Sequence, residues 1–249
     1  MRLVSHLRVA VRRRRKFPPA TSAVRGFVAI REGLEPVPYQ SDLERRFLVV
    51  CGCLPWIKQA QWEPFTLHFC EIATKLQRSY TPDFLVQFQD GSGGLGQVLV
   101  EVKRQKDWLR SAGYMAACYS AAEQWCQEQV DTRFFHASDD WFSAINFPNF
   151  EFMFAARKGA VPSSKRRELV KALLNESGLT MESAIELLKA QGLSDYNKAV
   201  ATLMALVSDG YLGFDVSAPL TMESPIDGNP LANPFTATTD PSRTGQGQV

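Results

Sequence analysis

Two stretches decide the fold: Tyr80-Thr-Pro-Asp-Phe-Leu-Val86 and, after a glycine-rich turn, Val98-Leu-Val-Glu-Val-Lys103. Both are rich in β-branched and aromatic residues, which is typical of buried strands. We expect strands over about 80–88 and 97–103, and the intervening turn makes them neighbours in one sheet. The pattern therefore predicts an α/β protein built around this strand pair.

Charged side chains interrupt these apolar stretches at three positions. Side chains alternate along a strand, so Glu101 and Lys103 point to the same face on either side of Val102. Asp83 lies on the neighbouring strand and can approach Glu101. Two carboxylates that converge among apolar residues repel each other and lose hydration, and a hard divalent cation compensates for both effects. We therefore expect Mg²⁺, with Mn²⁺ able to substitute, bound by Asp83, Glu101 and the carbonyl of Val102.

A helix is predicted over about 41–53, ahead of the strand pair. Ser41 and Glu44 have the S-x-x-E spacing of a capping box, and an apolar stripe follows them. Glu44 can reach the same site, where it would bind a second metal ion or fix a water molecule. The alternative for Glu44 is a purely local capping role, and the alternative for the E-x-K element is a solvated ion pair on a strand surface.

The surrounding pattern extends this core. Residues 64–69 alternate as in a strand, which predicts an antiparallel meander with the two strands above, and a further short strand is expected at 133–137. A helix is expected over about 106–129. Its sheet-facing residues are predicted to repeat at helical spacing: Tyr114, Cys118, Ala121 and Trp125.

Composition changes near residue 159, which predicts a domain boundary. Helical patterns at about 164–176, 180–191 and 194–209, followed by a predicted hairpin to 216, indicate a winged-helix-like domain. The third helix has Lys198 as its only basic residue, which favours protein docking over DNA reading, although 165–167 (Lys-Arg-Arg) keeps DNA contact open. The expected segments are a basic flexible arm at 1–23, a nuclease-like domain at 24–158, the helical domain at 159–217, and a disordered or partner-binding tail at 218–249.

The charge is unevenly distributed. The first sixteen residues hold seven Lys or Arg and no acid, and subtracting them from the net charge of +2 leaves −5 for the rest. A basic cluster favours phosphate, because each cation near a duplex displaces a condensed counterion. We expect the arm to contact DNA through five consecutive residues: Arg12, Arg13, Arg14, Arg15 and Lys16. The alternatives are a solvated tail or a targeting signal.

Cysteine usage and hydropathy indicate the cellular compartment of the protein. The five cysteines include no C-x-x-C pair, so they are expected to be buried apolar residues in a reducing compartment rather than zinc ligands. No stretch approaches the roughly twenty apolar residues of a membrane span. The sequence therefore predicts a soluble protein of the bacterial cytoplasm with no membrane partner.

From about residue 24 to residue 137 the chain resembles the catalytic domain of TnsA, the endonuclease subunit of heteromeric bacterial transposases in the PD-(D/E)xK nuclease superfamily. Four stretches carry the resemblance: Ser41-Asp-Leu-Glu-Arg-Arg-Phe47, Gln61-Trp-Glu-Pro64, Tyr80-Thr-Pro-Asp-Phe84 and Leu99-Val-Glu-Val-Lys103. The P-D…E-x-K element alone is shared with restriction enzymes, Holliday-junction resolvases and repair nucleases, whereas the S-x-L-E-R-x-F helix is more specific. Some members carry Gln where this chain has Glu101.

The resemblance implies a catalytic set of Glu44, Asp83, Glu101 and Lys103, with one or two metal ions per site. It also implies that this subunit cuts the 5′ ends of a transposon. An integrase-type transposase (TnsB) would cut and join the 3′ ends, and an AAA+ ATPase regulator (TnsC) would contact the C-terminal domain. The alternatives are a free-standing restriction or repair nuclease, and a catalytically silent DNA-binding adaptor on the same fold.

Overall fold

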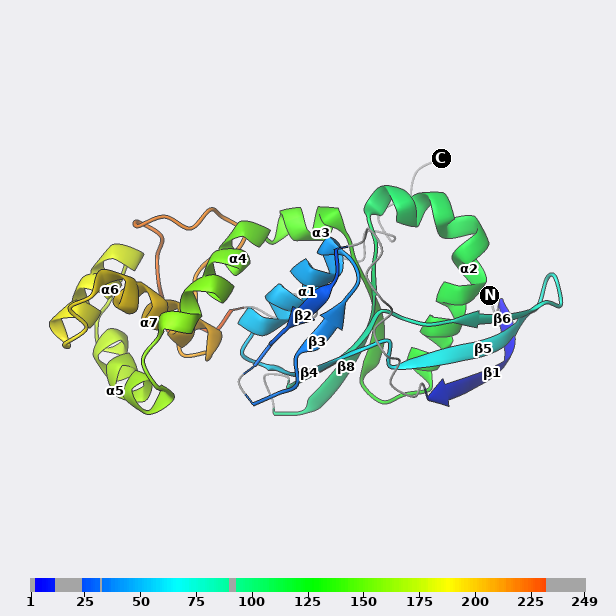
Figure 1. Ribbon diagram of the computed structural model, residues 1–249, viewed down its shortest axis with the longest axis horizontal. Coiled ribbons are helices and arrows are strands. Elements are labelled where there is room, and N and C mark those ends of the chain that lie inside the picture. The colour runs from blue at the N-terminus through cyan, green and yellow to red at the C-terminus, as the bar shows by residue number, and fades with distance from the viewer. Residues whose placement is uncertain (1–2, 12–23, 32, 90–92, 232–249) are drawn as a thin grey trace.

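The computed structural model describes residues 3–11, 24–31, 33–89 and 93–231. The N-terminal strands and helix are β1 (Val4–Val11), β2 (Gly26–Val28), β3 (Val37–Tyr39) and α1 (Asp42–Cys53). Next come β4 (Ile57–Trp62), β5 (Phe65–Glu71), β6 (Gln77–Tyr80), β7 (Phe84–Gln89), β8 (Leu95–Val102), α2 (Gln105–Gln127) and β9 (Thr132–Ala137). The remainder is helical: α3 (Asp139–Ala144), α4 (Phe147–Ala156), η1 (Arg157–Gly159), α5 (Ser163–Leu174), α6 (Met181–Ala190) and α7 (Tyr196–Ser208). The protein is thus a mixed α/β fold with N-terminal sheets and a C-terminal helical region, which lie at opposite ends of an elongated molecule (Figure 1).

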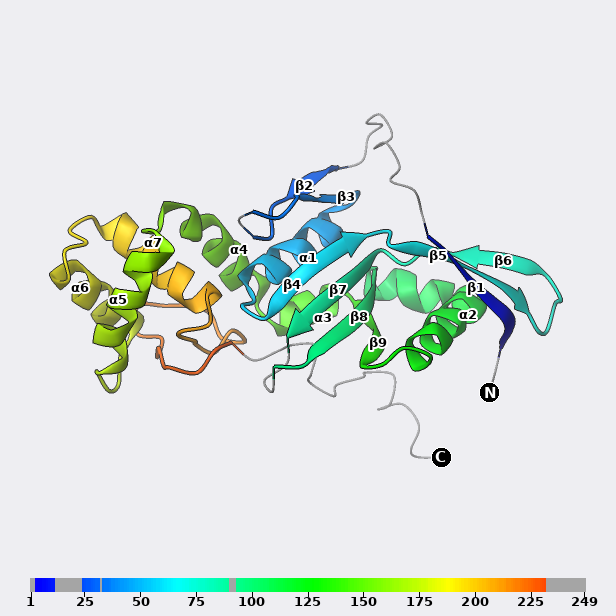
Figure 2. The same cartoon turned by 90° about the horizontal axis from the view of Figure 1, so that it is seen from below.

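The central sheet has the strand order β4-β7-β8-β9. The strand pair expected from the sequence is present: β7 and β8 run antiparallel with Phe84 opposite Val100, and β9 adds to β8 in parallel. Successive side chains of β8 point to opposite faces of the sheet, and each face packs against a different helix. Val98 and Val100 pack in the cluster that contains α1, whereas Leu99 packs in the cluster that contains α2. The sheet is therefore covered on both faces, by α1 on one and α2 on the other (Figure 2).

The neighbouring strands of the expected meander pair antiparallel, but they belong to two sheets and not to one. The segment predicted as one strand over 80–88 is two strands, because Thr81, Pro82 and Asp83 separate β6 from β7. Proline lacks the N–H that a continuous ladder needs, so the chain leaves one sheet and enters the other at this point. β6 pairs with β5 in a separate sheet of order β1-β5-β6, while β7 pairs with β4 and β8. This crossing places Asp83 at the junction of the two sheets.

Two segments expected to lack structure are ordered in part. Residues 4–11 of the expected flexible arm form β1, which pairs with β5 from Val4 opposite Glu71 to Val11 opposite Phe65. The side chain of Val4 is buried, which supplies apolar burial that the charge pattern did not reveal. The five basic residues expected to contact DNA, 12–16, lie outside the described residues.

The first part of the expected tail is also ordered, because residues 218–231 fold back on the protein. The Asn149 side chain donates to the carbonyl of Ala218 at 2.7 Å and accepts from the backbone N–H of Leu220 at 3.1 Å. The indole of Trp56 donates to the carbonyl of Leu231 at 3.2 Å. Buried Leu231 belongs to the core cluster that contains α1.

The C-terminal helices α5, α6 and α7 match the three expected helical patterns, but the expected hairpin is not formed. Between 209 and 231 the described chain has only isolated bridges, Thr180 to Pro225 and Gly213 to Asp227. One continuous cluster of buried residues extends from α1 and the sheet into α5, α6 and α7. No helix in the described ranges has the length and apolarity to cross a membrane.

Candidate active site at the junction of the two sheets

Asp83 occupies the short connection between β6 and β7, and its backbone fixes it to both neighbouring strands. Its N–H donates to the carbonyl of Val100 at 3.1 Å, and its carbonyl accepts from the N–H of Glu63 at 2.7 Å. The carboxylate Oδ2 accepts from the N–H of Val102 at 2.7 Å. Asp83 is thus held directly beside the end of β8, where Glu101 lies.

Glu101 is buried on the α2 side of β8. The hydroxyl of Tyr80 donates to Glu101 Oε2 at 2.6 Å. Burial raises the pKa of Glu101, and the nearby Glu44 charge raises it further, while the Tyr80 hydrogen bond and the Lys103 charge act in the opposite direction. Glu101 thus carries one strong hydrogen bond that holds its orientation, because hydrogen bonds to ionised groups are short and strong.

Asp83 and Glu101 repel each other. Burial raises the pKa of Asp83 well above its usual value, and the charges of Glu101 and Glu44 raise it further. The Val102 N–H opposes this shift without cancelling it. The pair therefore forms a concentration of negative charge, which Lys103 offsets only in part, since the pKa values of both carboxylates stay raised.

Glu44 belongs to the cap at the start of α1 and also faces the two carboxylates. The cap differs from the expected capping box, because the Glu44 carboxylate accepts from the N–H of Gln40 and not from that of the N-cap residue Ser41. The Glu44 N–H donates to Ser41 Oγ at 3.1 Å, and its carboxylate accepts from the N–H of Gln40 at 2.9 Å and from Ser41 Oγ at 3.0 Å. Burial raises the pKa of Glu44, and its charge in turn raises the pKa of Asp83 and Glu101. Both oxygens of the Glu44 carboxylate accept hydrogen bonds in this cap, Oε1 from Ser41 and Oε2 from Gln40, so the cap and the site share one carboxylate.

Lys103 follows the last residue of β8 and is fixed through its backbone. Its N–H donates to the carbonyl of Ala137 at 3.1 Å, and its carbonyl contacts His136 Nε2 at 2.9 Å. The His136 ring stacks on Trp108 at 3.9 Å, and Trp108 stacks on Tyr119 at 4.1 Å. This aromatic layer joins the start of α2 to the strand end that carries Glu101 and Lys103.

Sequence reasoning did not assign Tyr80 and Glu63 to the site. Tyr80 lies in the same motif as Asp83, but its bond to Glu101 depends on the separation of β6 from β7. Glu63 has a left-handed backbone with φ of 41°, and its charge raises the pKa of both Asp83 and Glu44. A non-glycine residue in this region costs roughly 1–2 kcal/mol, which is typical of positions held by their surroundings. The stretch Gln61-Trp-Glu-Pro64 was the available signal for Glu63.

The donor set fits a hard divalent cation. Oδ2 of Asp83 and Oε2 of Glu101 are each engaged by one hydrogen bond, so the second oxygen of each carboxylate remains for a ligand. Oxygen donors of this kind are those that Mg²⁺ and Mn²⁺ prefer. Within the described ranges, however, no cluster of three or more His, Cys, Asp or Glu side chains is already arranged around a common point.

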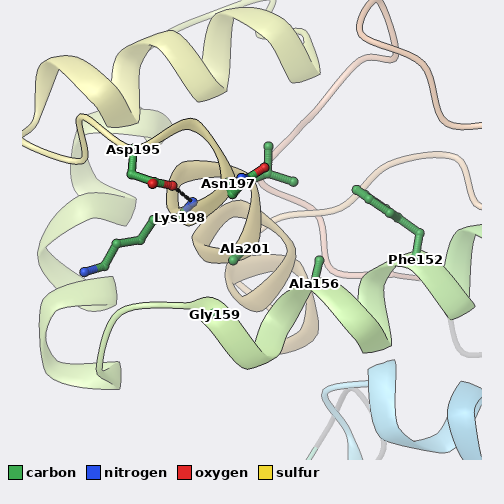
Figure 3. A pocket seen from close by; sticks show the side chains of 8 residues that line it. Phe152, Ala156, Gly159, Asp195, Asn197, Lys198 and Ala201 are labelled. Atoms are coloured by element: carbon green, nitrogen blue, oxygen red, sulfur yellow. Dashed lines mark hydrogen bonds between the residues drawn. The ribbon is translucent and has the colours of Figure 1, made fainter.

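A hollow lies between α4 and the start of α7, and none of the four candidate catalytic residues lines it (Figure 3). It is lined by Phe152, Ala156, Gly159, Asp195, Asn197, Lys198, Val200 and Ala201. Asp195 Oδ1 accepts from the N–H of Lys198 at 2.7 Å, so this carboxylate caps the helix. The hollow lacks the converging carboxylates of the sheet junction.

The fold and the site define a class: a mixed α/β protein with acidic side chains and a lysine gathered at the ends of adjoining strands. Residues 55–135 match the family model described as TnsA-like endonuclease N terminal. This segment of the chain is a TnsA-like endonuclease N-terminal domain, which confirms the family expected from the sequence. It holds Glu63, Tyr80, Asp83, Glu101 and Lys103, whereas Glu44 precedes the matched span. No curated protein matches the chain.

Proposed function

We propose that the chain is a Mg²⁺-dependent DNA endonuclease of the PD-(D/E)xK type, which hydrolyses phosphodiester bonds at the 5′ ends of a transposon. One observation carries the proposal: Asp83 and Glu101 lie on adjoining segments of a TnsA-like endonuclease domain, and the charge of Glu101 raises the pKa of the buried Asp83. Folded proteins ordinarily avoid placing two carboxylates together in a buried position, because their repulsion opposes folding. A site that binds a cation and a phosphate explains the arrangement.

Asp83, Glu101 and the carbonyl of Val102 would hold the metal, and Glu44 would bind a second ion or orient a water molecule. A bound Mg²⁺ or Mn²⁺ supplies a water of lowered pKa and neutralises charge on the scissile phosphate. Lys103 adds a fixed positive charge where the phosphate oxygens gain negative charge in the transition state. Tyr80 holds the Glu101 carboxylate in one orientation.

The family match supports placement in a heteromeric transposase, with an integrase-type TnsB subunit acting on the 3′ ends and a TnsC-type AAA+ regulator as a further partner. We assign the regulator contact to the C-terminal helices, and we propose that these helices form a winged-helix-like domain. Lys198 is the only basic residue of α7, a charge pattern poor for phosphate contact. A bacterial cytoplasmic setting, the PD-(D/E)xK core at 24–158 and the domain limits around it are part of the same proposal.

The test is strand-resolved mapping of cuts on end-labelled donor DNA with Mg²⁺ and the cognate transposase. Asp83→Asn keeps the size of the side chain and an oxygen able to accept from Val102, but removes the negative charge. Asp209→Asn makes the same chemical change next to α7, where Asp209 pairs with Arg166 at 2.7 Å. We expect 5′-strand cuts with the wild type and Asp209→Asn, and only 3′-strand cuts with Asp83→Asn.

Two other outcomes of the cleavage assay would support the alternative functions. Cleavage by the wild type without the transposase supports a free-standing restriction or repair nuclease. Identical products from wild type and Asp83→Asn, with transposition intact in both, support a silent DNA-binding adaptor and overturn the active-site assignment.

A further inference from the structure

The first half of α2 exposes a row of large and basic side chains to solvent. Lys106, Arg110 and Tyr114 follow each other at intervals of four residues, with Leu109 beside them, and they therefore lie on one face of the helix. Lys106 is exposed, and the exposed fractions are 64% for Leu109, 63% for Tyr114 and 82% for the Arg110 side chain. We call these four residues the α2 ridge.

Tyr114 was expected to face the sheet, together with Cys118, Ala121 and Trp125. The latter three are buried, but Tyr114 points to solvent. The Tyr114 side chain thus lies on the same exposed face as the basic residues and not on the buried face of α2. Tyrosine hydroxyls and basic side chains are both common donors to phosphate oxygens in protein–DNA interfaces.

The N-terminus of α2 carries both signs of charge. Asp139 Oδ1 accepts from the N–H of Gln105 at 2.6 Å, and Asp107 lies in the first turn together with Lys106. Asp107 pairs with Arg110 at 2.9 Å, but such exposed pairs contribute little. Lys106 and the exposed side chain of Arg110 therefore remain accessible to a ligand in solvent.

The ridge begins beside the candidate active site. α2 starts two residues after Lys103, on the face of the sheet that carries Glu101. Trp108, within the first turns of α2, stacks on His136, which lies opposite Glu101 in the strand register. A helix rises 1.5 Å per residue, so the ridge runs about 12 Å from Lys106 to Tyr114. That length matches roughly three to four phosphates of one DNA strand, which are spaced by about 3.4 Å along the duplex axis.

We propose that the α2 ridge binds the phosphate backbone of duplex DNA next to the bond that is cut. The inference rests on the proposed function and adds to it the surface that holds the flanking DNA. Lys106 and Arg110 bind phosphate oxygens, Tyr114 donates a further hydrogen bond, and Leu109 covers the sugar between them. Arg and Tyr are common in protein interfaces as well, so the choice of DNA rests on the position of the ridge beside the candidate active site and on Lys106, a residue type that is depleted in protein interfaces.

The test measures binding of the full chain to a duplex of about twenty base pairs by fluorescence anisotropy, without divalent metal so that no strand is cut. The salt concentration is varied, and wild type is compared with the double variant Lys106→Gln/Arg110→Gln. Each lost phosphate contact lowers the slope of log affinity against log salt by about 0.9. We expect the slope to fall by about 1.8 and the affinity to fall by tens of fold near 0.1 M salt.

The matched control is Lys171→Gln/Lys198→Gln, which removes the same charge from two exposed lysines on α5 and α7. It is expected to keep the wild-type slope. The ridge variant should melt close to the wild-type Tm, because both substituted side chains are exposed and exposed ion pairs contribute little. If the ridge variant binds the duplex with the wild-type slope, this inference is overturned and the endonuclease proposal stays intact. A wild type without affinity for any duplex also overturns this inference, whereas the endonuclease proposal is tested separately by the strand-resolved mapping of cuts.

Discussion

Replacing Tyr80 by Phe removes the one hydroxyl that donates to Glu101 Oε2 at 2.6 Å. The phenyl ring keeps the volume that packs edge-on against Tyr119 at 6.1 Å. A hydrogen bond to a charged group contributes about 1.5–3 kcal/mol. Because this hydrogen bond holds the pKa of Glu101 down, its loss raises that pKa further.

A cation binds the ionised carboxylate, so this shift makes metal binding compete with a proton. The pKa of Glu101 is already raised by burial, and Tyr80 is one of the two groups that hold it down. We expect Tyr80→Phe to weaken Mn²⁺ binding several-fold or more at pH 6, with recovery toward the wild-type affinity at pH 8. Calorimetric titration of Mn²⁺ at pH 6, 7 and 8 measures this directly.

Tyr119→Phe is the matched control, because it removes one phenolic hydroxyl from the same aromatic cluster. Its Mn²⁺ affinity is expected to follow the wild type at every pH. If the pH dependence of Mn²⁺ binding is the same in Tyr80→Phe and wild type, Tyr80 does not control the ionisation of Glu101 and the reasoning fails.

Three further predictions concern charge. Asp83→Asn is expected to abolish cleavage while raising the metal-free Tm by a few degrees, because it relieves repulsion with Glu101 and keeps an acceptor for Val102; a lower Tm in thermal melts would contradict this. The raised pKa of Asp83 means that the folded state binds a proton more tightly than the unfolded state. Its contribution to stability is thus present at low pH and lost as the pH rises through the folded-state pKa. The wild-type Tm should consequently fall between pH 5 and 7 more steeply than that of Asp83→Asn, and parallel curves would refute the assignment. Substituting Gln at 12–16 is expected to reduce the salt slope of DNA binding, because with each cation removed fewer counterions are released on binding; an unchanged slope would remove the arm from the DNA interface.

Local sequence patterns determined the helices and the strand pair of the site. A capping-box spacing and an apolar stripe gave α1, and turn residues between two apolar runs gave β7 and β8. These signals act within a few residues, through hydrogen bonds and side-chain periodicity. Asp83, Glu101 and Lys103 came together in the prediction for the same reason, since a single turn joins their strands.

Tertiary structure alone decided which strands pair and what surrounds the carboxylates. β1 pairs with β5, β6 leaves the sheet of β7, and 218–231 return to Asn149 and Trp56, all through contacts distant in sequence. Tyr80 reaches Glu101 only because of that strand crossing, and Tyr114 faces solvent although its spacing matches the buried face of α2. The free energy of burial depends on the whole core. A local sequence pattern therefore does not determine which apolar segment packs against which other one. The sequence by itself specified the acidic pair and its lysine, and the packing of distant strands specified the hydrogen bonds and charges that set their chemistry.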